Sequence, residues 1–146
     1  MASFLLLNAF STSVDREATP DPTNRQRRVA EPGRYARAMT EVNVVLVVTV
    51  TDDRAVAETL AHAAVESRVA ACVQVSGPVS SVYRWQGAIE TAEEWQVSAK
   101  TTEAKADELV SLWRSHHPYE VPEILVTPVL GGNLDYLAWV STETTD

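Results

Sequence analysis

Two adjacent histidines, His116 and His117, are the residues of this chain whose types best suit chemistry. Neutral imidazole is the commonest side-chain ligand of zinc and copper, and Glu123, or less favourably Glu120, adds a carboxylate oxygen nearby. The chain has no repeated ligand spacing of the Cys-x-x-Cys or His-Glu-x-x-His kind. Residue types alone therefore favour a structural role at a helix end, where the dipole stabilises a histidine. A divalent-metal site at His116, His117 and Glu123 is the alternative hypothesis.

The histidines lie where a helix must give way to a strand. Leu109, Leu112 and Trp113 have the spacing of an amphipathic helix, which begins near residues 101–103. Pro118 disfavours helical geometry at His117 and lacks an amide hydrogen, so the chain turns there. The following segment, residues 123–130, is rich in β-branched residues and predicts a strand that holds Pro128 at an edge or a bulge.

The preceding segments predict a strand at 42–50, a helix that Thr51, Asp52 and Asp53 cap and that ends near Arg68, and a strand that starts at 71. Gly77-Pro78 bends this strand without ending it, and the pattern resumes at 79–85. Gln86-Gly87 makes a turn, and the return strand runs to residue 100 with Trp95, Val97 and Ala99 on one face.

This hairpin is long for so small a protein. Its outer half, which carries Tyr83 and Trp85, extends beyond a compact monomer, and exposed aromatic strand edges favour pairing with another chain. We therefore expect an oligomer whose subunits exchange hairpin contacts. Gly131-Gly132-Asn133 then precedes a short last helix at 134–140, with Tyr136, Leu137 and Val140 together over a sheet edge. The order strand, helix, strand, strand, helix, strand predicts an α+β, ferredoxin-like sandwich.

Length and composition limit the function classes. The 146 residues suffice for one domain, and no apolar run reaches the roughly 20 residues that span a bilayer. Residues 41–146 carry six basic against sixteen acidic residues, a net charge of −10, which argues against nucleic acid as a partner and favours cations. The single cysteine, Cys72, allows no intrachain disulfide, so a reducing cytoplasm is the expected compartment.

Residues 1–40 form a separate N-terminal extension, and residues 41–146 form the folded domain. The extension carries six arginines against four acidic residues and lacks apolar periodicity after Phe4-Leu5-Leu6-Leu7, so we expect it to be disordered. It is a tail, an organellar leader, or the product of a mis-assigned start, since Met39 directly precedes the ordered pattern. The sequence leaves these three alternatives open.

Several segments in the same order resemble the CutA divalent-cation tolerance family. They are Val44 to Val50 with Asp52, 70–73, 81–87, 100–102, 116–123 and 136–139, and the match covers residues 42–141. The resemblance implies a ferredoxin-like subunit in a tight homotrimer, similar to the PII signal proteins. It also implies a cytoplasmic, non-enzymatic role in tolerance of copper and other divalent cations.

Copper ligands in the family are credited to two histidines, which match His116 and His117, and to a first-strand cysteine. Val48 stands at the position of that cysteine here. Without the thiolate, the resemblance implies a weaker site for Cu(II) or Zn(II) rather than tight Cu(I) binding.

Two other function classes compete with metal binding. A PII-like regulatory or scaffold trimer would bind a small molecule or a protein in inter-subunit clefts near Tyr83, Trp85 and Glu94. An enzyme is disfavoured, because the chain has no Gly-rich phosphate loop and no nucleophile elbow, and Asp52 and Asp53 beside Arg54 would repel a phosphate.

Overall fold

The computed structural model describes residues 43–145. The elements are β1 (Val44–Thr51), α2 (Arg54–Glu66), β2 (Cys72–Trp85), β3 (Ala88–Thr102), α3 (Glu103–His116), β4 (Ile124–Pro128) and α4 (Leu134–Glu143). The expected N-terminal extension, residues 1–40 with Met39, lies outside the described residues, so the domain boundary stays a prediction.

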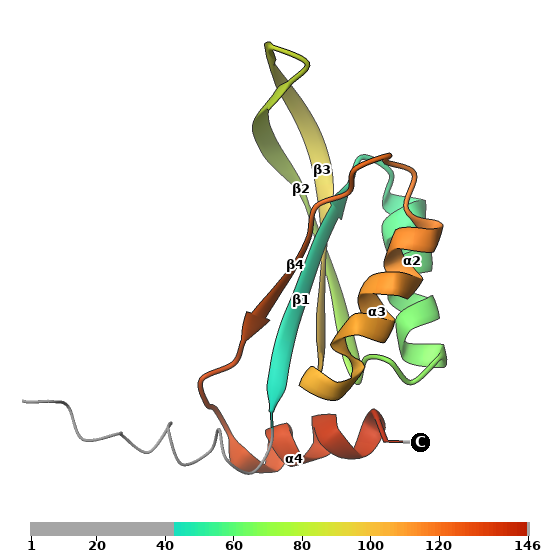
Figure 1. The fold of residues 1–146 in the computed structure, drawn as a ribbon, viewed down its shortest axis with the longest axis vertical. Helices are drawn as coiled ribbons and strands as arrows, with labels where there is room; N and C mark the ends of the chain where they lie inside the picture. The colour runs from blue at the N-terminus through green and yellow to red at the C-terminus, as the bar shows by residue number, and fades with distance from the viewer. Residues whose placement is uncertain (1–42, 146) are drawn as a thin grey trace, which may run out of the picture. The chain divides into compact units, whose positions relative to one another are not determined.

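The four strands form one antiparallel sheet in the order β2-β3-β1-β4. Helices α2 and α3 lie side by side on one face of this sheet, and α4 lies at the end of the sheet opposite the hairpin tip (Figure 1). This confirms the α+β class and the predicted order of strands and helices. None of the described helices is both long enough and apolar enough to span a membrane.

The core lies between the sheet and the two helices, as the apolar spacing predicts. Val47 of β1 and Val97 of β3 are fully buried against Leu60, Leu109 and Trp113 of the helices. The indole N–H of Trp113 donates to the carbonyl of Leu60 at 3.1 Å, which ties α3 to α2. Burial of these side chains fixes the orientation of α3, whose C-terminal end carries the histidines.

The β2–β3 hairpin extends beyond the rest of the sheet (Figure 1). Pairing of β1 with β3 stops at Thr51 and Trp95, whereas β2 and β3 stay paired out to Trp85 and Ala88. We call the part from Val79 to Glu94 the arm. A register shift between Ser76 and Val79 confirms that Gly77-Pro78 bends β2 without ending it.

One local prediction needs correction. The last strand ends at Pro128 rather than near residue 130. β4 is an edge strand of the sheet, and a proline is tolerated at such a position, as predicted. In α4, Leu137 and Val140 are buried against Val44, and Tyr136, although 40% exposed, interacts with Cys72 at the start of the edge strand β2. Thr102 occupies the N-cap of α3 without a capping hydrogen bond from its side chain.

Candidate functional site

His117 follows α3 directly, and both of its ring nitrogens are hydrogen-bonded within the chain. Nε2 lies 2.9 Å from the carbonyl of Val50 and 3.2 Å from the hydroxyl of Thr49. On the other side of the ring, the backbone N–H of Tyr119 donates to Nδ1 at 3.2 Å. A carbonyl only accepts and a backbone N–H only donates, so this pattern requires a neutral imidazole with its proton on Nε2.

Burial of the imidazole favours the same neutral state. It lowers the pKa of His117 below the ordinary value of 6.5, although the Val50 carbonyl and the charges of Glu94 and Asp52 act in the opposite direction. The ring also packs edge-on against the ring of Tyr119, with centroids 5.0 Å apart. His117 therefore links the turn after α3 to the end of β1.

His116 has a different environment. Its side chain is exposed, and Nδ1 lies 2.9 Å from both the carbonyl of Leu112 and the hydroxyl of Ser115. Nε2 makes no hydrogen bond to any residue in the range 43–145, so this nitrogen is available to a ligand. Both ring nitrogens of His117 are therefore hydrogen-bonded, whereas His116 is hydrogen-bonded within that range through Nδ1 only.

The third predicted metal ligand, Glu123, sits beside the turn. Its backbone carbonyl accepts a 2.7 Å hydrogen bond from Thr49, while its exposed side chain lines a cleft. Val48, where the family has a cysteine, pairs with Leu125 of β4 and Ser98 of β3. Within residues 43–145, no three His, Cys, Asp or Glu side chains are grouped so that they could hold a metal ion.

Tyr119 connects the turn to the arm. Its hydroxyl donates to Oε1 of Glu94 at 2.9 Å and accepts from the backbone N–H of Asp52 at 3.0 Å. Burial raises the pKa of Tyr119, and the hydrogen bond and charge of Glu94 raise it further. The phenol therefore stays protonated and remains a donor to Glu94 at physiological pH.

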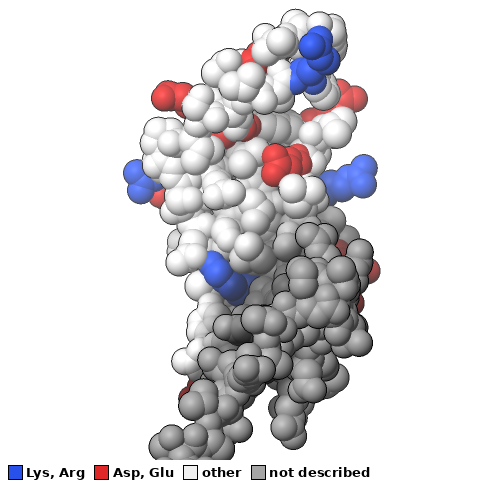
Figure 2. Space-filling view, turned by 90° about the vertical axis from the view of Figure 1, so that its left-hand side faces the viewer, with Lys and Arg blue, Asp and Glu red and all other residues white. Residues whose placement is uncertain are grey.

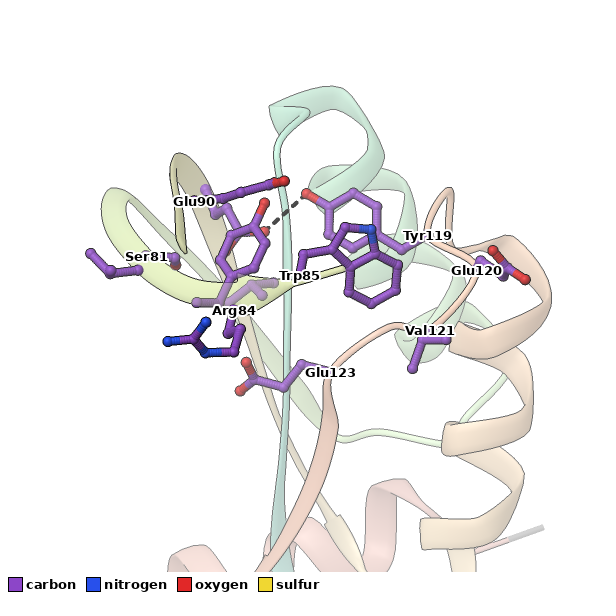
Figure 3. Close-up of a pocket in the computed structure, with 12 residues that line it drawn as sticks. Ser81, Arg84, Trp85, Glu90, Tyr119, Glu120, Val121 and Glu123 are labelled. Atoms are coloured by element: carbon purple, nitrogen blue, oxygen red, sulfur yellow. Dashed lines mark hydrogen bonds between the residues drawn. The ribbon is translucent and has the colours of Figure 1, made fainter. Parts of the chain in front are cut away.

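A cleft of about 640 Å³ opens between the arm and the turn. Figure 3 shows residues of the arm and residues of the segment after α3 around it. Its lining is Val50, Ser81, Val82, Tyr83, Arg84, Trp85, Glu90, Glu94, Tyr119, Glu120, Val121 and Glu123. Tyr83, Trp85, Glu94 and Glu123 thus line one cleft within a single chain, whereas the cleft predicted from the sequence lies between subunits and stays a prediction.

The lining of the cleft is acidic. It includes four glutamates and one arginine. Figure 2 shows acidic side chains spread over the upper half of the described face, with basic side chains among them. Partial burial raises the pKa of Tyr83, with a further contribution from the charge of Glu90. The guanidinium of Arg84 donates to the carbonyl of Gly87 at the hairpin turn, at 3.1 Å. The excess of carboxylates in the lining of the cleft attracts cations.

Glu90 and Tyr119 are among the cleft residues that sequence reasoning missed. Glu90 lies four residues before Glu94 in the same strand, so the period of two already places both on one face. Tyr119 stood in the histidine segment, but nothing in the sequence indicated that its hydroxyl meets a carboxylate 25 residues upstream.

Comparisons with known proteins identify the family and the fold. The family model described as CutA1 divalent ion tolerance protein matches residues 45–143. A divalent-cation tolerance protein CutA of Salmonella newport is 38% identical over 97 residues, which are 66% of this chain and 84% of the relative.

Solved structures show the same fold. The divalent cation tolerance protein of Thermus thermophilus is 37% identical, with a TM-score of 0.68 over 70% of this chain and 99% of its own. CutA from Synechococcus elongatus, solved in complex with a Bis-Tris molecule, is 37% identical, with a TM-score of 0.65 over 70% of this chain and 94% of its own. The chain therefore belongs to the CutA1 divalent ion tolerance protein family.

Proposed function

We propose that this chain acts in divalent-cation tolerance as a non-enzymatic homotrimer of ferredoxin-like subunits, and that it binds divalent cations beside the histidine turn. The observation that carries the proposal is the concentration of carboxylates there. Glu120 and Glu123 follow the turn directly and line one cleft with Glu90 and Glu94. Carboxylates and imidazoles together suit Cu(II) and Zn(II).

The predicted ligands contribute unequally to such a site. His116 offers Nε2 and Glu123 offers an exposed carboxylate, whereas His117 must give up its hydrogen bond from Tyr119 before Nδ1 can bind a metal. Fewer preformed ligands mean weaker binding, in keeping with Val48 at the position of the family cysteine. Metal binding at His116, His117 and Glu123 remains a prediction.

Exposed apolar side chains support the oligomer. Val82 and Ile89 of the arm are 69% and 68% exposed, and Leu125 of the edge strand β4 is 57% exposed. An arm and an open strand edge of this kind are covered when copies of the chain associate. We propose a homotrimer, and light scattering of the purified protein tests it against a monomer or a dimer.

Titration calorimetry with Cu(II) and Zn(II) tests the metal site. We expect the double variant His116→Ala, His117→Ala to lower the affinity at least tenfold. His62→Ala is the matched control, because His62 is exposed on α2 away from the turn. Equal affinities of the wild-type protein and the double variant would contradict binding by these histidines.

A second function is favoured by the cleft itself. Tyr83, Trp85 and Glu94 line a cleft large enough for a small molecule, and the Synechococcus relative is titled as a complex with Bis-Tris, a small organic molecule. We propose as the alternative a PII-like regulatory trimer that binds a small molecule or a partner there. Substitutions in the cleft that abolish ligand binding without affecting metal affinity would favour this alternative.

We also propose a cytoplasmic location, since the single cysteine suits a reducing compartment. A relative from Archaeoglobus fulgidus, 27% identical with a TM-score of 0.68, is titled a periplasmic divalent cation tolerance protein. Cell fractionation distinguishes the two compartments.

A further inference from the structure

Glu94 is a largely buried residue in the wall of the cleft, and its carboxylate has no cationic partner among residues 43–145. Only 4% of the residue is exposed, yet neither ion pair among residues 43–145 involves it, since these join Arg54 to Glu58 and Lys105 to Glu108. Its one hydrogen bond within that range comes from the hydroxyl of Tyr119. A buried carboxylate is costly unless a cation or several donors stabilise it. No side-chain N or O atom of the described residues is both buried and without a hydrogen-bond partner, so Oε2 of Glu94 faces the open cleft and can accept a hydrogen bond from a ligand.

Three aromatic side chains line the same cleft. Tyr83, Trp85 and Tyr119 line the cleft together with Glu94 (Figure 3). The faces of tyrosine and tryptophan rings attract organic cations, most strongly where water is excluded. The only positive side chain of the lining, Arg84, is bonded to the hairpin turn through Gly87. A buried acid framed by aromatic rings is the arrangement that recognises an ammonium group.

Two observations favour an organic cation over a metal ion at Glu94. Around Glu94, no three His, Cys, Asp or Glu side chains of residues 43–145 are grouped so that they could hold a metal ion. The cleft volume of about 640 Å³ also falls in the range of small-molecule sites and far exceeds that of a bare ion.

We propose that the cleft binds a small organic ammonium ion, whose N–H groups donate to Glu94 and whose hydrocarbon part packs against Trp85 and Tyr83. This inference rests on the proposed use of the cleft as a ligand site. Tyr119 acts as a positioning residue, because its hydrogen bond to Oε1 fixes the carboxylate and leaves Oε2 for the ligand.

Calorimetry on the full-length protein tests this with putrescine, a diammonium, and with 1,4-butanediol, its neutral counterpart of similar length. We expect putrescine to bind and the diol not to bind. Glu94→Gln should weaken putrescine binding roughly tenfold or more, because a charge-assisted hydrogen bond is lost. Trp85→Leu should weaken it several-fold through loss of the cation–π contact.

Glu93→Gln is the matched control, since Glu93 is the exposed neighbour of Glu94 and points to the other face of the strand. Glutamine keeps an acceptor for Tyr119, and circular dichroism and solution mass check that each variant folds. Equal binding of the diol, or unchanged putrescine binding in Glu94→Gln, would overturn the inference. Binding of Zn(II) without putrescine would overturn it and leave the metal proposal intact, whereas binding of neither would overturn both.

Discussion

The hydroxyl of Tyr119 donates a 2.9 Å hydrogen bond to Oε1 of Glu94, which joins the turn after α3 to the arm. The hydroxyl oxygen of Tyr119 also accepts a 3.0 Å hydrogen bond from the backbone N–H of Asp52, after β1. Three segments far apart in the sequence therefore meet at one phenol, and the shape of the cleft depends on it.

Replacement of this phenol should destabilise the protein. Tyr119→Phe removes both hydrogen bonds and leaves the buried Glu94 without a donor, so we expect the free energy of unfolding to fall by about 1–3 kcal/mol. Tyr83→Phe is the control, because Tyr83 is 42% exposed. Urea unfolding of the two variants measures the difference, and equal stabilities would show that the Tyr119 hydroxyl contributes nothing.

His117 should make stability depend on pH near neutrality. Its pKa in the folded protein is lower than in the unfolded chain, so the unfolded chain takes up the proton first as the pH falls. Neutral His117 stabilises the fold fully above about pH 6.5, the ordinary pKa of histidine. This stabilisation decreases as the pH drops from 6.5 towards the lower pKa of His117 in the folded protein. Melting temperatures in chelator should therefore fall more steeply below pH 6.5 in the wild-type protein than in His117→Gln. His116→Gln, at an exposed site, should behave like the wild type.

Gly77 should tolerate no larger residue. Its φ of +147° is accessible essentially to glycine alone, and an added Cβ would lie 2.9 Å from the carbonyl oxygen of Glu94. We expect Gly77→Ala to cost about 1–3 kcal/mol of stability and to displace the arm. Gly132→Ala is the control, since no atom lies within 4 Å of its added Cβ. Thermal unfolding compares them, and a neutral Gly77→Ala would mean that the bend adapts freely.

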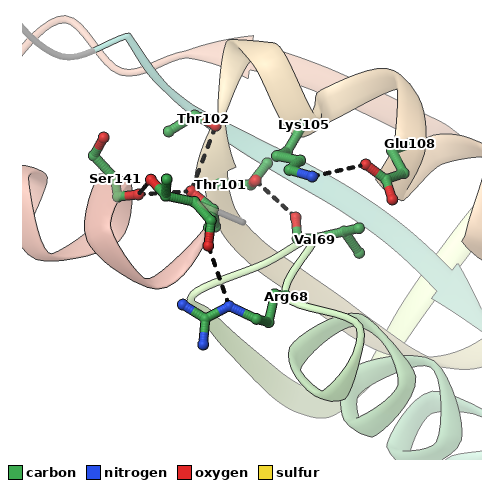
Figure 4. A network of polar contacts seen from close by, with 9 residues as sticks. Arg68, Val69, Thr101, Thr102, Lys105, Glu108 and Ser141 are labelled. Atoms are coloured by element: carbon green, nitrogen blue, oxygen red, sulfur yellow. Dashed lines mark hydrogen bonds and ion pairs between the residues drawn. The ribbon is translucent and has the colours of Figure 1, made fainter.

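Arg68 has an unfavourable backbone conformation, but its side chain makes stabilising hydrogen bonds. Its φ is +56°, while its guanidinium donates to the carbonyls of Thr142 and Thr145 at the end of α4. Figure 4 shows Arg68 with one of these hydrogen bonds. Arg68→Ala loses the hydrogen bonds and keeps the unfavourable backbone conformation, whereas Arg68→Gly loses the bonds but adopts this conformation readily. We expect the glycine variant to be more stable than the alanine variant by about 1 kcal/mol. Denaturant midpoints provide the test, and the reverse order would refute this account.

The sequence by itself determined the order of the elements and the residues of the core. Alternation at Trp95, Val97 and Ala99 identified the inner face of β3, and the spacing of Leu109 and Trp113 identified the buried face of α3. These predictions succeed because side-chain direction follows from a local period, which is two in strands and 3.6 in helices. The extended pattern at 79–85, with its aromatic residues, likewise indicated the arm, because the hairpin that it predicted is too long to fit within a compact monomer.

Only the tertiary structure decided how the site is built. Alternation assigned Glu94 to the polar face of β3, but it could not show that the turn after α3 covers it and buries it to 4% exposure. Likewise, both nitrogens of His117 are bonded to β1 and to the turn, which no local pattern encodes. A period specifies which way a side chain points, whereas its partners depend on which distant segments the packed core brings to that face.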